Sequence, residues 1–122
     1  MASNKRFRFG PIALSTTTTT NLLNPATATG GVNAGSSSQF IVLNHIRIVN
    51  KTAAAATFTL YLGATGANAA GTEVIGVATP VAANSSFDYY GALRLDAADF
   101  LVGGAGTATA LTITGEGEVG VA

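Results

Sequence analysis

The sequence has no cysteine and few charged residues, and both shortages narrow what the protein can be. Without cysteine there is no disulfide framework, no thiolate metal site and no cysteine nucleophile. Asp, Glu, Lys and Arg make up 10% of the 122 residues, whereas an ordinary globular protein has about 25%. A surface so poor in charge must consist of Thr, Ser, Asn and backbone, or be covered by other protein.

Long apolar runs are also missing. No stretch of about 18 apolar residues could span a membrane, and Arg8 and Pro11 interrupt the apolar residues near the start. We therefore expect no signal peptide and a chain that is soluble when made. The formal net charge is zero, which argues against a nucleic-acid binder held by phosphate contacts.

The charges that are present divide the chain into a basic and an acidic part. All five charged residues up to Lys51 are basic, and six of the seven that follow are acidic. Residues 24–38 are rich in Ala, Thr, Gly and Ser and show no apolar period, which predicts a long loop. We therefore divide the chain into an extended N-terminal arm and loop, residues 1–38, and a folded domain, residues 39–122.

The arm carries the first set of candidate partner-binding residues. Its basic groups would bind an acidic neighbouring surface, and its two phenylalanines would insert into a groove of that neighbour. Deleting residues 1–10 is then predicted to leave the fold intact and to abolish attachment. The candidates are Lys5, Arg6, Phe7, Arg8 and Phe9.

Beyond the arm, short apolar segments alternate with turn residues at roughly even spacing. Residues 57–62 alternate most clearly, with Phe58, Leu60 and Leu62 on one side. Residues 39–50 have apolar residues on both faces, with Phe40, Val42, Ile46 and Ile48 expected to share one face and Asn44 as its exception. The pattern predicts an all-β fold, an antiparallel β-sandwich that is jelly-roll-like, following the extended N-terminal arm.

One glycine-rich segment is similar to a cofactor-binding loop. Gly63 and Gly66 follow an apolar strand, as in loops that bind the pyrophosphate of a dinucleotide. Ala69 takes the place of the third glycine, and Pro80 rules out a long helix after it. We interpret the segment as a connecting loop and predict no cofactor.

Few residues offer catalytic or metal chemistry. His45 is the single histidine and lies in a hydrophobic strand, so we interpret it as structural. An enzyme would need a pocket in which a carboxylate lies within hydrogen-bond reach of His45. Asp96 and Asp99 could bind calcium, but a helical turn capped by Asp96 is the favoured interpretation. No catalytic or metal-binding residue is predicted.

Two further groups of side chains are candidates for the surface. Glu116 and Glu118 alternate with glycine, and we interpret them as charges on an edge strand that block unwanted pairing. Adjacent strand residues face opposite ways, so one of Tyr89 and Tyr90 should be in the core and the other available to a partner. The possible surface aromatics are Tyr61, Tyr89 and Tyr90.

Four segments carry a resemblance to a known group of proteins. The segments HIRIVNKTAAAATFTLYLGATG, AANSSF (residues 82–87), LRLDAADFLVGG and TITGEGEV resemble small β-sandwich virion structural proteins of tailed bacteriophages. The resemblance implies a non-enzymatic capsid decoration (cement) protein that binds the major capsid protein and stabilises the head. It also implies assembly into the virion in the bacterial cytoplasm.

The composition and the resemblance leave the partner open. A charge-poor surface suits a homo-oligomer, expected as a trimer on the capsid. The alternative function is a tail or tail-fibre module, an adhesin that contacts host surface glycans. In that case the surface tyrosines would line a groove beside Asp or Asn.

Overall fold

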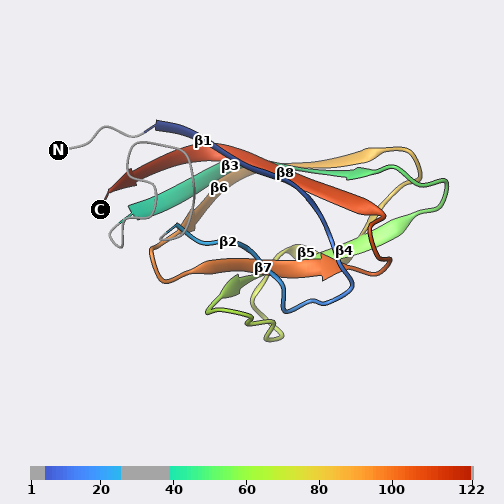
Figure 1. The fold of residues 1–122 in the computed structure, drawn as a ribbon, viewed down its shortest axis with the longest axis horizontal. Coiled ribbons are helices and arrows are strands. Elements are labelled where there is room, and N and C mark those ends of the chain that lie inside the picture. The colour runs from blue at the N-terminus through green and yellow to red at the C-terminus, as the bar shows by residue number, and fades with distance from the viewer. Residues whose placement is uncertain (1–4, 26–38, 122) are drawn as a thin grey trace.

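The structure is a computed structural model that describes residues 5–25 and 39–121. Its strands form two four-stranded antiparallel sheets, which lie one above the other in Figure 1. Sheet A has the order β1-β8-β3-β6, and sheet B has the order β2-β7-β4-β5. The strands are β1 (Lys5–Ala13), β2 (Asn21–Leu23), β3 (Gln39–Asn50), β4 (Ala56–Gly63), β5 (Glu73–Val81), β6 (Ser86–Leu95), β7 (Phe100–Ala105) and β8 (Leu111–Val121).

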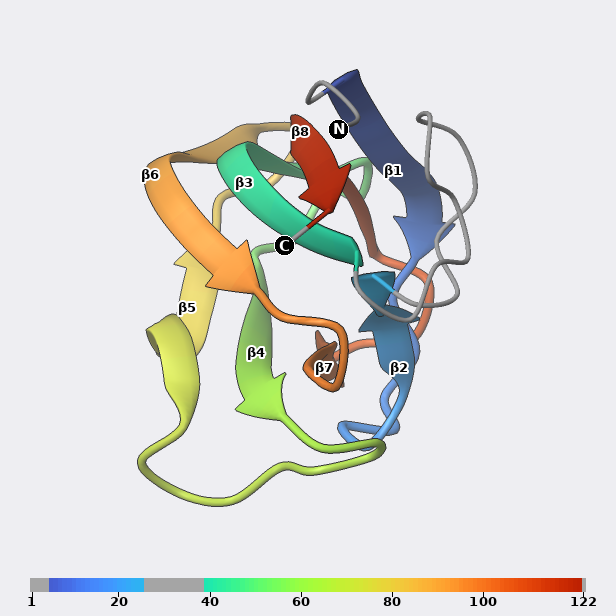
Figure 2. The same cartoon turned by 90° about the vertical axis from the view of Figure 1, so that its left-hand side faces the viewer.

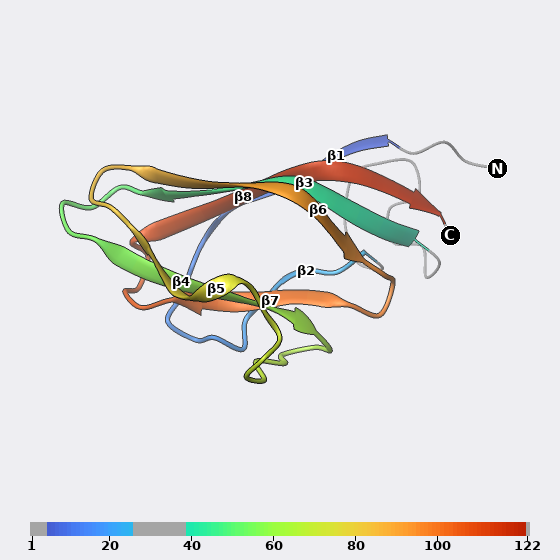
Figure 3. The same ribbon diagram turned by 180° about the vertical axis from the view of Figure 1, so that it is seen from behind.

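The strand order identifies the sandwich as a jelly roll. All connections except β4 to β5 join strands of different sheets, and the resulting pair of interleaved Greek keys defines this topology. Figure 2, seen from one end, and Figure 3, seen from behind, show the two layers closing around a common interior. The prediction of an all-β, jelly-roll-like antiparallel sandwich is confirmed.

The core is built from one face of each sheet, as period-two alternation requires. Phe58 and Leu60 of β4 are buried, as predicted, and Leu62 packs against the core. Sheet A contributes Ile46, Ile48 and other aliphatic side chains of β3 and β8. The segment 64–72 joins β4 to β5, so the connecting-loop interpretation of the glycine-rich segment is correct.

A β-bulge in the central strand β3 corrects the predicted faces of that strand. The pairing of β3 with both neighbours shifts between Leu43 and His45, so Asn44 is an extra residue opposite β8. Two consecutive residues, Asn44 and His45, then point outward, and the alternation restarts one residue later. As a result Ile41 and Leu43 face the core together with Ile46 and Ile48, whereas Phe40 and Val42 lie on the outer face.

The alternation of Gly and Glu near the carboxyl end reflects close packing inside sheet A. A methyl group at Gly115 would overlap the ring of Phe9, and one at Gly117 would overlap the carbonyl oxygen of Val42. Glycine faces inward at both positions, and Glu116 between them faces outward. Because β8 lies between β1 and β3, the prediction that Glu116 and Glu118 belong to an edge strand is wrong.

The predicted N-terminal arm is also wrong for its described residues. β1 pairs with β8 along its length, and β2 pairs with β7, so the boundary placed between residues 38 and 39 does not separate a domain. Phe7 and Phe9 are 6% and 7% exposed and belong to the core of their own chain. The alternation Phe-Arg-Phe places the two rings inward and Arg6 and Arg8 outward. Residues 1–4 and 26–38 lie outside the described residues.

Deleting residues 1–10 is accordingly expected to unfold the protein, contrary to the expectation from the sequence. The deletion removes most of β1 and two buried phenylalanines, and losing one such ring to Ala costs about 3–5 kcal/mol. That is comparable with the whole stability of a small domain, about 5–15 kcal/mol. Circular dichroism and denaturant unfolding of the deletion variant and of Phe9→Ala would measure the loss. A deletion variant as stable as the full chain would contradict the placement of β1.

Gly117→Ala is expected to destabilise the fold by about 1–3 kcal/mol or more, because the added methyl group meets backbone that cannot move without disturbing β3. Glu116→Ala, on the outer face of the same strand, is the matched control and should change stability by less than about 0.5 kcal/mol. Urea unfolding of both variants gives the comparison. Equal stabilities would show that the sheet can absorb a side chain at Gly117.

Candidate functional site

The outer face of sheet A holds a cluster of polar side chains around the bulge. His45 and Arg47 come from β3, Asp88 from β6 and Glu116 from β8. These strands are adjacent, with Arg47 directly opposite Asp88 and His45 directly opposite Glu116. The bulge at Asn44 is the reason that His45 points to this face and not into the core.

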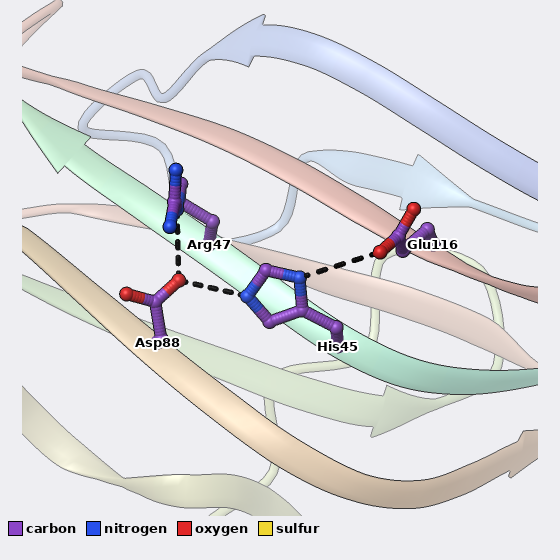
Figure 4. A network of polar contacts seen from close by, with 4 residues as sticks. All are labelled: His45, Arg47, Asp88 and Glu116. Carbon is purple, nitrogen blue, oxygen red and sulfur yellow. Dashed lines mark hydrogen bonds and ion pairs between the residues drawn. The ribbon is translucent and has the colours of Figure 1, made fainter.

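Asp88 is the centre of the cluster. Its Oδ1 atom accepts hydrogen bonds from His45 Nε2 at 2.7 Å and from Arg47 Nε at 2.8 Å. The other imidazole nitrogen, Nδ1, lies 3.7 Å from Glu116 Oε1. Figure 4 shows the imidazole held between the two carboxylates, which come from the strands on either side of β3. Both ring nitrogens of His45 therefore face an acidic group.

The charged partners shift the protonation of the cluster. The hydrogen bond from Arg47, and then that from His45, lower the pKa of the Asp88 carboxyl below its ordinary value. In turn Asp88 raises the pKa of the Arg47 guanidinium. Asp88 thus remains a carboxylate under ordinary conditions and accepts hydrogen bonds without donating them.

An aromatic ring completes the cluster. The phenol ring of Tyr90 stacks on the imidazole of His45, with ring centroids 4.6 Å apart and planes inclined by 7°. Tyr90 is 71% exposed, while the side chain of His45 is 20% exposed. Tyr89, its neighbour, packs against the core. The prediction that the two tyrosines face opposite ways, one toward the core and one toward solvent, is confirmed.

A shallow depression of about 280 Å³ lies beside the cluster. Its polar lining includes Arg8, Arg47, Thr114 and Glu116. Arg8 forms no ion pair within the described part of the chain. A second hollow of about 350 Å³ lies between β1 and β2, and core residues such as Phe9 and Leu23 form much of its wall.

The geometric condition that we set for an enzyme is met in part. His45 lines a depression and has a carboxylate within hydrogen-bond reach. A general base, however, needs a nitrogen that can take a proton from a substrate, and here Nε2 bonds to Asp88 while Nδ1 faces Glu116. Among the described residues no hydroxyl or other nucleophile hydrogen-bonds to His45. The two acidic groups fix the orientation of the imidazole, and they leave neither ring nitrogen without an acidic neighbour.

The other predicted residues are dispersed. Tyr61 lies on β4 in sheet B, away from the two tyrosines of sheet A, so the three tyrosines do not line one groove. Arg6 and Arg8 are exposed on β1, whereas Phe7 and Phe9 are buried. Lys5 begins β1.

At the β6–β7 connection Asp99, and not the predicted Asp96, supplies the capping carboxylate. The carboxylate of Asp99 accepts a hydrogen bond from the backbone N–H of Asp96 at 2.9 Å, and that of Asp96 accepts one from Arg94 Nε at 2.8 Å. The segment is a tight turn, in which the Asp99 N–H also donates to the Asp96 carbonyl. The described residues contain no group of three or more His, Asp or Glu side chains that could hold a metal ion.

Arg47 and Asp88 were missed as site residues from the sequence. Their contact depends on the register between β3 and β6, which are far apart in the chain. The one available signal was the isolated Asn44 on a face otherwise apolar, since a polar interruption of this kind can mark a bulge.

Comparisons with known proteins give no relative from which a role could be transferred. Searches of protein-family profiles, curated proteins and solved structures find no match to this chain. In the described ranges there is also no helix long and apolar enough to cross a membrane.

Asp88→Asn is expected to flatten the acid dependence of stability. Because the pKa of Asp88 is lower in the folded chain than in the unfolded chain, its contribution is present above the unfolded pKa, about 4, and is lost as pH falls through the folded value. Denaturant unfolding of both proteins from neutral to strongly acidic pH would measure this. A variant whose stability falls with acid as steeply as that of the wild type would contradict the assignment.

Proposed function

We propose that the protein is a non-enzymatic structural component of a bacteriophage virion, a capsid decoration protein that binds the major capsid protein and stabilises the head. The observation that carries the proposal is the concentration of charge on one sheet of a jelly roll. Of the twelve charged residues eight lie on the strands of sheet A, and one, Glu73, lies on sheet B.

The fold is compatible with this role. Jelly-roll sandwiches occur in viral capsid proteins and also in lectins and cupins, so the topology alone does not choose among functions. The resemblance of the β3–β4, β6–β7 and β8 segments to phage virion proteins favours the capsid role. The engagement of both imidazole nitrogens of His45 by acidic groups argues against acid–base catalysis at the one histidine.

The proposed mode of attachment uses β1, the strand at one edge of sheet A, in place of a free arm. Arg6 and Arg8 remain available on β1, because they form no ion pair within the described ranges. Each exposed ion pair with an acidic capsid surface would contribute about 1 kcal/mol or less. Useful affinity would then come from several copies acting together, which supports the proposal of a homo-oligomer, as in the expected trimer.

The alternative proposal is a tail or tail-fibre module that contacts host glycans. One observation favours it, namely the exposed ring of Tyr90 beside Asp88. The two proposals differ in where the protein sits on the virion, and they are separated by whether it loads onto capsids.

The test is loading of the purified protein onto phage capsids that lack it, with the mass of the free protein measured by light scattering. A trimer that binds in fixed stoichiometry to the major capsid protein is the expected result. An oligomer or monomer that does not bind capsids would contradict decoration and favour the tail module.

Removing the cations of β1 should weaken this loading without unfolding the protein. Arg6→Gln combined with Arg8→Gln removes two exposed cations, so we expect lower occupancy and a weaker dependence of binding on salt. Glutamine avoids a new negative charge opposite Glu118 and Glu116 of β8. Lys51→Gln, at an exposed cation in the turn after β3, is the single-charge control and should load normally. Full loading of the double variant would show that β1 does not contact the capsid.

A further inference from the structure

We propose that Tyr90 and the polar groups beside it form a binding site for a saccharide. The site specifies the surface that the alternative proposal of a glycan-binding module would use. It does not depend on the decoration function, because β6 and β1 lie at opposite edges of sheet A. The decisive feature is an aromatic ring that is fixed on one side and open on the other.

The imidazole of His45 supports one face of the Tyr90 ring. With 71% of Tyr90 exposed, the opposite face of the ring is open to solvent. The imidazole cannot turn freely, because Asp88 and Glu116 face its two nitrogens. The phenol ring is therefore a preorganised flat platform, of the kind on which the apolar C–H face of a pyranose ring can lie.

Hydrogen-bonding groups of both kinds lie next to the platform. Arg47 donates a hydrogen bond from Nε to Asp88. The N–H groups of its two terminal nitrogens form no hydrogen bond in the described part of the chain. Asp88 uses Oδ1 for both of its contacts, and its Oδ2 accepts no hydrogen bond from a described residue. Neighbouring sugar hydroxyls can accept from the first group and donate to the second.

The surroundings favour a saccharide over other ligands that stack on aromatic rings. The phosphate of a nucleotide would meet two carboxylates, Asp88 and Glu116. A protein hot spot usually lies within an apolar patch that excludes water, but the contacts of Tyr90 and its neighbours are to charged or polar side chains. The depression of about 280 Å³ beside His45 is lined by Arg47 and Glu116 but not by Tyr90, so it adjoins the platform and is not part of it.

The test is a titration of the full-length, isotope-labelled protein by NMR. The probes are the uncharged methyl glycosides of glucose, galactose, mannose and N-acetylglucosamine. The expected result is saturable shifts, for at least one probe, of amides in β3 and β6 near His45 and Tyr90. Tyr90→Ala should weaken that binding about tenfold or more, whereas Tyr90→Phe, which keeps the ring, should retain it.

Tyr61→Ala is the matched control, since it removes a tyrosine from sheet B and should leave binding unchanged. Tyr90 is exposed, so its variants should fold, and the spectra themselves report this. The proposal is overturned if none of the four probes shifts these amides, or if binding survives in Tyr90→Ala. It is also overturned if the same amides broaden with protein concentration alone, which would assign the surface to a second copy of the chain. Capsid loading of Tyr90→Ala, measured separately, shows whether the decoration function stands without the saccharide site.

Discussion

The single extra residue in β3 is the constraint on which both the core and the surface cluster depend. A strand of regular alternation would place Ile41 and Leu43 on one face and Ile46 and Ile48 on the other, so half of the central strand would expose its aliphatic side chains. The bulge at Asn44 brings all four into the core. The same change of register turns His45 outward, whereas regular alternation would have put it on the inward face with Ile41 and Leu43. The site is thus a by-product of how the central strand satisfies the core.

Much of the fold could be predicted from period-two alternation. The segment 57–62 gave the correct strand and inward face, because its pattern is clean and the chain reverses at both ends. The prediction failed for β1 and β8, where the local composition gave no sign of how the strand pairs in the sheet. Basic residues around Phe7 and Phe9 suggested an arm, but Arg6 and Arg8 lie on the outer face of a strand whose aromatic residues are buried. Glu116 and Glu118 suggested an edge strand, but β8 lies inside sheet A, where its glycines allow the neighbouring strands to pack closely.

The surface cluster was harder to predict because it is non-local. The sequence predicted that one of Tyr89 and Tyr90 would face solvent, and the structure shows that it is Tyr90. The contact of Asp88 with His45 and Arg47 depends on two long strands pairing in one register. No spacing along the chain encodes that register, and the bulge shifts it further. Sequence reasoning could name the histidine but could not supply the carboxylates that fix it.

The pairing of the first and last strands has a mechanical consequence. β1 and β8 are antiparallel neighbours, and Lys5 lies opposite Val119, so the described ends of the chain meet at one end of sheet A. A pulling force applied through these two ends would separate β1 from β8 one hydrogen bond after another, starting at that pair. Rupture in this unzipping geometry needs less force than shearing all the bonds of a strand together. A load borne through the faces of the sandwich would not engage this weak direction.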